Sequence, residues 1–124
     1  AAYHYLGKIS YAEKHFEQSI RYFNKLISLV PRDSDAYFTR GAAKGMISDL
    51  AGSIEDYSKA IGIDPDFAEA YANRGVAKIN LLTRNGNIQP TQKQTKDACK
   101  DLRKAKQLGD DSVDDLIFIY CEKK

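Results

Sequence analysis

The chain has 124 residues, of which 43% are hydrophobic and 29% charged, and its formal net charge is +2. This balance is that of a folded protein and excludes a disordered chain. The small net charge excludes a strong nonspecific attraction to nucleic acid or to an acidic membrane surface. No apolar run approaches the roughly 18–20 residues that a membrane helix needs, so we predict no membrane span. No signal peptide is visible, but the chain starts at Ala1, so the location stays unknown, with a cytoplasmic and an exported protein both open.

An interval of 34 residues recurs along the first two thirds of the chain. It separates equivalent aromatic, glycine and proline positions: Tyr3, Tyr37 and Tyr71; Gly7, Gly41 and Gly75; Phe23 and Tyr57; Pro31 and Pro65. The interval then becomes 45, both between Tyr57 and Leu102 and between Ala60 and Ala105. The third unit therefore carries 11 extra residues, which fall between 80 and 98. Such a period is the signature of a helical-repeat protein.

Apolar and small residues fall at helical spacing in each unit, which predicts two helices per repeat. In chain order, we expect helices over 2–13, 16–29, 35–47, 50–63, 69–82, 92–108 and 112–122. Ser34 and Asp35 suit the start of the third helix, and Ser48 and Asp49 the start of the fourth. The extra residues should form a loop near 83–90, followed by a capping box of Thr91 and Gln94. The last helix has apolar residues on one face, which is typical of a terminal capping helix.

The repeated glycines lie in the middle of the first helix of each unit. Glycine costs about 1 kcal/mol relative to alanine at such a position. This cost predicts that a neighbouring helix approaches closely there.

These repeats resemble the tetratricopeptide repeat, and the resemblance covers nearly the whole chain. The matching positions are Tyr3, Leu6, Gly7, Ser19, Phe23 and Pro31; Tyr37, Gly41, Ser53, Tyr57, Ala60 and Pro65; Tyr71, Gly75, Ala98, Leu102 and Ala105. The resemblance implies an all-α fold, an α-α superhelix (solenoid) of three helical hairpins with a C-terminal capping helix, as in bacterial-type proteins of this family. It implies one domain over 1–124, with repeats at 1–33, 34–67 and 68–111, the insertion near 83–94, and the cap at 112–122.

The resemblance also implies where function lies, because the first helices of such hairpins line a concave groove that binds a peptide or protein segment. The candidate groove residues are His4, Tyr5, Lys8, Tyr11, Phe38, Thr39, Ala42, Met46, Ala72, Asn73, Val76 and Asn80. For Tyr5, Tyr11 and Phe38, core packing and groove contact are equally open, whereas Tyr3, Tyr37, Tyr57 and Tyr71 are assigned to packing. Relatives that grip a chaperone's C-terminal carboxylate use a clamp of basic and amide groups. At the corresponding positions only Lys8 offers a firm positive charge and Glu69 would repel a carboxylate, which argues against such a receptor.

Arg40 and Asp56 lie on the two helices of one hairpin, which predicts a structural ion pair. Arg74 should form a similar structural ion pair, and Asp56 is a candidate partner for it. Cys99 and Cys121 lie opposite each other about the turn at Gly109, so they should be neighbours. Buried free thiols are the favoured interpretation of this pair. A disulfide is the alternative, and it would point to an exported protein.

We find no catalytic motif, phosphate loop or metal-binding spacing, and His4 and His15 fall on different helices. We therefore expect no enzyme activity, no cofactor and no metal site. Lysines and Arg103 make the helix over 92–108 basic. A solvated face is the favoured interpretation, and nucleic acid is disfavoured because exposed aromatics are missing there.

Two main functional hypotheses remain, and neither of them involves catalysis. The first is an adaptor or scaffold for a protein or peptide partner, for which Phe38→Ala and Lys8→Ala should weaken binding but not stability. The alternative is an assembly element that forms a homo-oligomer through its N-terminal face. A third class is a regulatory part of a larger repeat-containing protein.

Overall fold

The computed structural model describes residues 2–122 and is helical throughout its regular structure. The helices are α1 (Ala2–Ala12), α2 (Phe16–Leu29), α3 (Ser34–Met46), α4 (Leu50–Ile63), α5 (Ala68–Thr83), α6 (Gln92–Gln107) and α7 (Asp114–Tyr120). The ends of α1 to α6 lie within one residue of the predicted positions. The last predicted helix is shorter, because a 3₁₀ turn, η1 (Asp111–Val113), precedes α7.

Side-chain caps fix several of these helix starts. Helix α3 starts at the predicted Ser34, and Asp33 caps it by accepting a hydrogen bond from the backbone N of Ala36 at 3.1 Å. The start of α4 at Asp49 is confirmed. The predicted capping box of Thr91 and Gln94 is confirmed at α6. These caps satisfy amide groups that the first helical turn leaves without partners.

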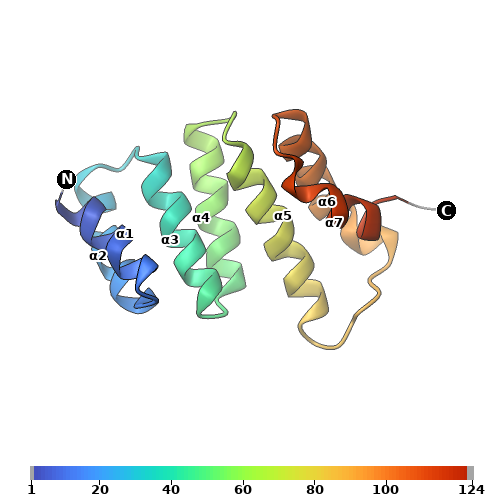
Figure 1. Cartoon of the computed structure of the whole chain (residues 1–124), viewed down its shortest axis with the longest axis horizontal. Helices are drawn as coiled ribbons and strands as arrows, with labels where there is room; N and C mark the ends of the chain where they lie inside the picture. Colours follow the sequence, from blue (N-terminus) through green and yellow to red (C-terminus); the bar gives the residue numbers. More distant parts are fainter. Residues whose placement is uncertain (1, 123–124) are drawn as a thin grey trace. The chain divides into compact units, whose positions relative to one another are not determined.

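The chain divides into two compact units, residues 1–65 and 66–124. In the first unit, α2 packs against both α1 and α3, and α3 packs against α4 (Figure 1). The core of this unit is built on Phe23, Leu26 and Ala36, with Tyr3 and Ile27 packed against it. The arrangement of all repeats in a single domain stays a prediction.

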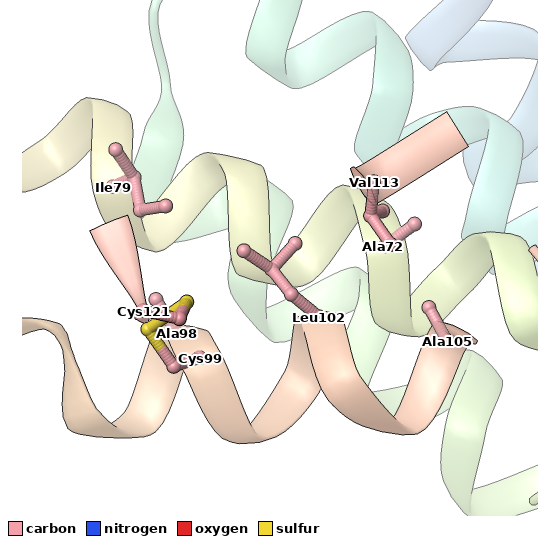
Figure 2. Packing of buried hydrophobic residues seen from close by; sticks show 8 residues of the cluster. All are labelled: Ala72, Ile79, Ala98, Cys99, Leu102, Ala105, Val113 and Cys121. Atoms are coloured by element: carbon pink, nitrogen blue, oxygen red, sulfur yellow. A yellow bond between two sulfur atoms is a disulfide. The ribbon is translucent and has the colours of Figure 1, made fainter. Parts of the chain in front are cut away.

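The second unit contains α5, α6, η1 and α7 around its own core. Figure 2 shows Leu102 of α6 at the middle of this cluster, with Val113 and Ala72 near one end and the cysteines near the other. Leu116, Ile117 and Tyr120 of α7 pack against the cluster, so α7 covers α6 as predicted for a cap. Among residues 2–122 no helix is long and apolar enough to cross a membrane.

The repeated glycines mark close helix contacts, as predicted. A Cβ placed on Gly7 would lie 2.6 Å from the ring of Phe23, and one on Gly75 would lie 2.8 Å from Leu102. A Cβ on Gly41 would lie 3.0 Å from that of Asp56. Two of the three hairpins add a bond at the same place, because the hydroxyls of Ser19 and Ser53 donate to the carbonyls of Gly7 and Gly41.

We expect Gly7→Ala to lower the free energy of unfolding by about 1–3 kcal/mol, because the new methyl overpacks a fully buried ring. Gly62→Ala is the matched control. A Cβ there meets nothing within 4 Å, so alanine should stabilise α4 by up to about 1 kcal/mol. Urea titration followed by circular dichroism measures both changes. Equal effects of the two substitutions would contradict the role given to the close contact.

Candidate functional site

Two of the predicted groove residues of α1, His4 and Lys8, contact one carboxylate of α3, that of Asp35. The Nζ of Lys8 lies 2.9 Å from Oδ2 of Asp35, and the Nε2 of His4 lies 3.5 Å from the same oxygen. These groups are all partly exposed, so the contacts contribute little to stability. They do place Lys8 beside a negative charge, which reduces its ability to bind a carboxylate of a ligand.

The candidate aromatic residues of the first unit separate into packed and exposed groups. Tyr11 makes an edge contact with Phe16 at 5.3 Å between ring centroids, and Phe38 lies 5.7 Å from Tyr57. In contrast, Tyr5 is 68% exposed and Met46 is 56% exposed. Thr39 and Ala42 are half-buried. Tyr5 and Met46 are therefore the large apolar candidates on these helices that a partner could cover.

The candidates on α5 lie in the second unit and differ in burial. Ala72 is buried in the core of that unit, so it is excluded as a groove contact. Val76 is half-buried and packs against the same core. Asn73 is half-buried, and Asn80 is exposed. Asn73 and Asn80 thus keep polar groups available, while the two apolar positions contribute to packing.

A buried ionic arrangement occurs once in each unit. The guanidinium of Arg40 donates two hydrogen bonds to Asp56, at 2.9 and 2.8 Å, which confirms the predicted ion pair. Lys44 lies 3.2 Å from the same carboxylate, and Arg40 also lies over the ring of Tyr37. The hydrogen bonds to Asp56 raise the pKa of Arg40 above its ordinary value. The pairing thus favours the charged form of Arg40.

In the second unit, Arg74 donates two hydrogen bonds to Asp101, at 2.9 and 2.7 Å, and Lys78 lies 2.8 Å from it. Hydrogen bonding to Asp101 likewise raises the pKa of Arg74. The suggested partner Asp56 is replaced here by Asp101, which the sequence analysis missed. A signal for it was present, because Asp101 follows Asp56 by the same 45 residues that separate Tyr57 from Leu102.

The two cysteines are brought together as a disulfide between Cys99 of α6 and Cys121 at the end of α7. Both are buried, and the bond is visible in Figure 2. The favoured interpretation of free thiols is therefore replaced by the alternative. The hydroxyl of Thr95 donates to the carbonyl of Tyr120, and Arg103 donates to that of Cys121 at 2.9 Å. These contacts hold the end of the cap on α6.

The described residues do not bring together three or more His, Cys, Asp or Glu side chains that could hold a metal ion. His15 lies 3.7 Å from Glu13, and both side chains are exposed. His4 faces Asp35, as described above. Within residues 2–122, every buried side-chain N or O atom has a hydrogen-bond partner.

Two family models match the chain. A model described as "Tetratricopeptide repeat" matches residues 1–33, and one described as "TPR repeat" matches residues 48–81. Among curated protein sequences, none matches the chain at a significant level.

Solved structures with the same fold span most of the chain. The second TPR domain of human RPAP3, in complex with the HSP70 peptide SGPTIEEVD, has a TM-score of 0.78 at 20% identity over 94% of this chain and 90% of that one. The TPR2B domain of yeast Sti1, in a complex with pHsp70, has a TM-score of 0.77 at 21% identity, with 96% and 90% covered. The Arabidopsis OM64 TPR domain has a TM-score of 0.75 at 24% identity, with 87% and 80% covered. At these identities the likeness establishes the fold and not the ligand.

Proposed function

This chain belongs to the tetratricopeptide repeat family, and from that premise we propose that it is a non-catalytic module that binds a peptide or protein segment. The observation that carries the proposal is the exposure of two large apolar side chains, Tyr5 and Met46, on the first helices of the first two hairpins. Side chains of this size on a rigid helical support are suited to the apolar residues of a partner. Lys8 and Asp35 add a polar pair beside Tyr5 that can hydrogen-bond a peptide backbone.

The solved complexes of RPAP3 and Sti1 support peptide binding by this fold, but the ligand should differ here. The HSP70 peptide bound by RPAP3 ends in EEVD, which carries three acidic side chains. In this chain Lys8 already pairs with Asp35, and Glu69 is exposed at the start of α5. Each carboxylate disfavours an acidic peptide end at its own helix. We therefore propose an apolar peptide segment, bound without a C-terminal carboxylate.

The test is a selection of peptides from a displayed random library, followed by affinity measurement with the purified protein. Tyr5→Ala combined with Met46→Ala should weaken the selected peptides at least tenfold, about 1.4 kcal/mol, because it removes the exposed anchors. Leu29→Ala is the matched control, since Leu29 is 65% exposed on the second helix of its hairpin. Phe38→Ala is unsuitable, because its ring packs on Tyr57 and its loss should also lower stability.

The proposal fails if no peptide is enriched, or if enriched peptides bind the double variant as tightly as the wild type. Circular dichroism before each titration verifies that the variants keep their helices. Lys8→Ala gives a second reading. It should weaken peptides that use the polar pair and leave the melting temperature within about 2 °C, because the pair with Asp35 is exposed.

Self-association is the second candidate function, and one observation favours it. Leu6 and Ile9 are 41% and 53% exposed on α1. Ala43 stands 34 residues after Ile9 and is fully buried on α3, which packs against α2. The face of α1 that carries Leu6 and Ile9 is thus equivalent to one that another helix covers. Light scattering over a concentration range tests it, since Leu6→Glu with Ile9→Glu should abolish any oligomer, and a monomeric wild type at high concentration would refute it.

A further inference from the structure

We propose that the exposed face of α6 is a second interaction surface and that it binds an acidic segment of a partner protein. The surface is a basic row of five side chains, Lys93, Lys96, Lys100, Arg103 and Lys104. All are exposed except Lys104, which is half-buried. Helix α6 as a whole carries six cations and two carboxylates, while the complete chain has a surplus of only two positive charges. The charge is therefore concentrated on this one element.

The cations of the row are not neutralised by the protein itself. The four lysines of the row form no ion pair with any side chain in residues 2–122, and Arg103 donates only to the carbonyl of Cys121. Lys106 is different, because it pairs with both Asp111 and Asp114, and these bonds raise its pKa. The acidic residues at the start of the cap thus form ion pairs with Lys106 and not with the cations of the row. The repulsion between neighbouring cations that form no ion pair is reduced when an anionic partner binds.

The row borders a hollow of about 1070 Å³ within the second unit. Tyr71, Arg74 and Lys78 of α5 line one side, and Lys96, Lys100 and Lys104 line the other. Two carboxylates, Asp97 and Asp101, also line the hollow, and Asp101 is held between Arg74 and Lys78. The lining as a whole keeps a positive surplus, because its six cations outnumber these two carboxylates. An acidic side chain entering the hollow would meet cations on both sides.

The spacing of the row fits an extended acidic peptide. Lys96, Lys100 and Lys104 are four residues apart, which is about 6 Å per step along a helix. Alternate residues of an extended chain lie about 6.6–6.8 Å apart on one face. A segment with Asp or Glu at every second position can therefore place one carboxylate near each lysine.

Nucleic acid fits this face less well. Helix α6 contains no aromatic residue on which a base could stack. Asp97 is exposed beside the lysines and would repel a continuous phosphate backbone. An acidic peptide can place an uncharged residue opposite Asp97, whereas phosphates recur at every nucleotide.

The test uses two labelled probes and two triple variants. The first probe is a twelve-residue peptide of alternating Glu and Ser, and the second is an oligothymidylate with the same number of negative charges. Lys96→Gln, Lys100→Gln and Lys104→Gln together remove three of the five charges of the row, those that line the hollow. Arg21→Gln, Lys25→Gln and Lys59→Gln together are the matched control, because they remove the same charge from exposed positions on α2 and α4.

At low ionic strength, the wild type should bind the Glu peptide, and the row variant should bind it at least about tenfold more weakly. The control variant should stay within about twofold of the wild type, and added salt should weaken binding. Absence of binding to the Glu peptide, or an equal loss in both triple variants, would overturn the proposal. Tighter binding of the oligothymidylate than of the peptide would also overturn it, in favour of a nucleic-acid site. Circular dichroism of both variants shows that a loss of binding is not a loss of fold.

Discussion

Asp56→Ala should lower the free energy of unfolding by about 3–5 kcal/mol, the largest effect that we expect of a single substitution. Asp56 is only 1% exposed and binds Arg40 and Lys44, whose side chains are less than one fifth exposed. Removal of the carboxylate leaves two partly buried cations without an anion and breaks two short hydrogen bonds. Thermal and urea unfolding measure the change, which should lower the melting temperature by roughly 10 °C or more.

Glu55→Ala is the matched control, because Glu55 is the exposed neighbour of Asp56 on the same helix. Its effect should stay within about 0.5 kcal/mol. A double-mutant cycle of Arg40→Ala and Asp56→Ala then gives the coupling energy between the two side chains. A loss below about 1 kcal/mol for Asp56→Ala would mean that the pair contributes no more than an exposed ion pair, contrary to our expectation.

Reduction of the disulfide should destabilise the second unit by about 3 kcal/mol, since Cys99 and Cys121 are separated by 22 residues in the chain. The bond reduces the number of conformations open to the unfolded chain, and it also links α7 covalently to α6. Helix α7 has only seven residues, far fewer than the roughly 12–15 that an isolated helix needs for even marginal stability. Without the bond, the cap depends on the packing of Val113, Leu116 and Ile117 and on two hydrogen bonds that side chains of α6 donate to its backbone carbonyls. The exposed ion pairs of Lys106 with Asp111 and Asp114 add to these contacts.

Hydrogen exchange measured with and without reductant tests this expectation. Protection of the amides in α7 should fall on reduction, while the amides of α2 and α3 should keep their protection. Cys99→Ser combined with Cys121→Ser should reproduce the reduced state and be insensitive to reductant. Identical melting of the oxidised and reduced wild type would show that packing alone holds the cap.

Much of the fold follows from the repeat itself. The 34-residue period places each helix, because residues at equivalent positions of a helical hairpin meet the same neighbours. The ends of α1 to α6 were predicted to within one residue on this basis. The mid-helix glycines predicted close contacts, because glycine is retained at such a cost only where a side chain would overlap a neighbour. The Arg40–Asp56 pair followed from the antiparallel geometry of one hairpin.

The sequence was less informative about side chains that reach beyond their own hairpin. Asp35 was interpreted as a helix-start residue, yet it binds His4 and Lys8 of the preceding hairpin. Side-chain contacts between different hairpins depend on the distance between the helices and on side-chain rotamers. The 34-residue period carries information about neither of these. The same limit applies to Tyr5 and Phe38, for which the sequence left packing and groove contact equally open. Phe38 packs on Tyr57 of α4, whereas Tyr5 is 68% exposed.

The sequence by itself determined the helical hairpins, their register and the insertion in the third repeat, because these depend on local periodicity and turn residues. Only the tertiary structure decided that Cys99 and Cys121 form a disulfide, since a bond requires close Cα atoms, here 5.6 Å apart. The tertiary structure also decided which cations are neutralised. Lys106 and the lysines of the basic row look alike in the sequence, but only Lys106 lies within reach of Asp111 and Asp114.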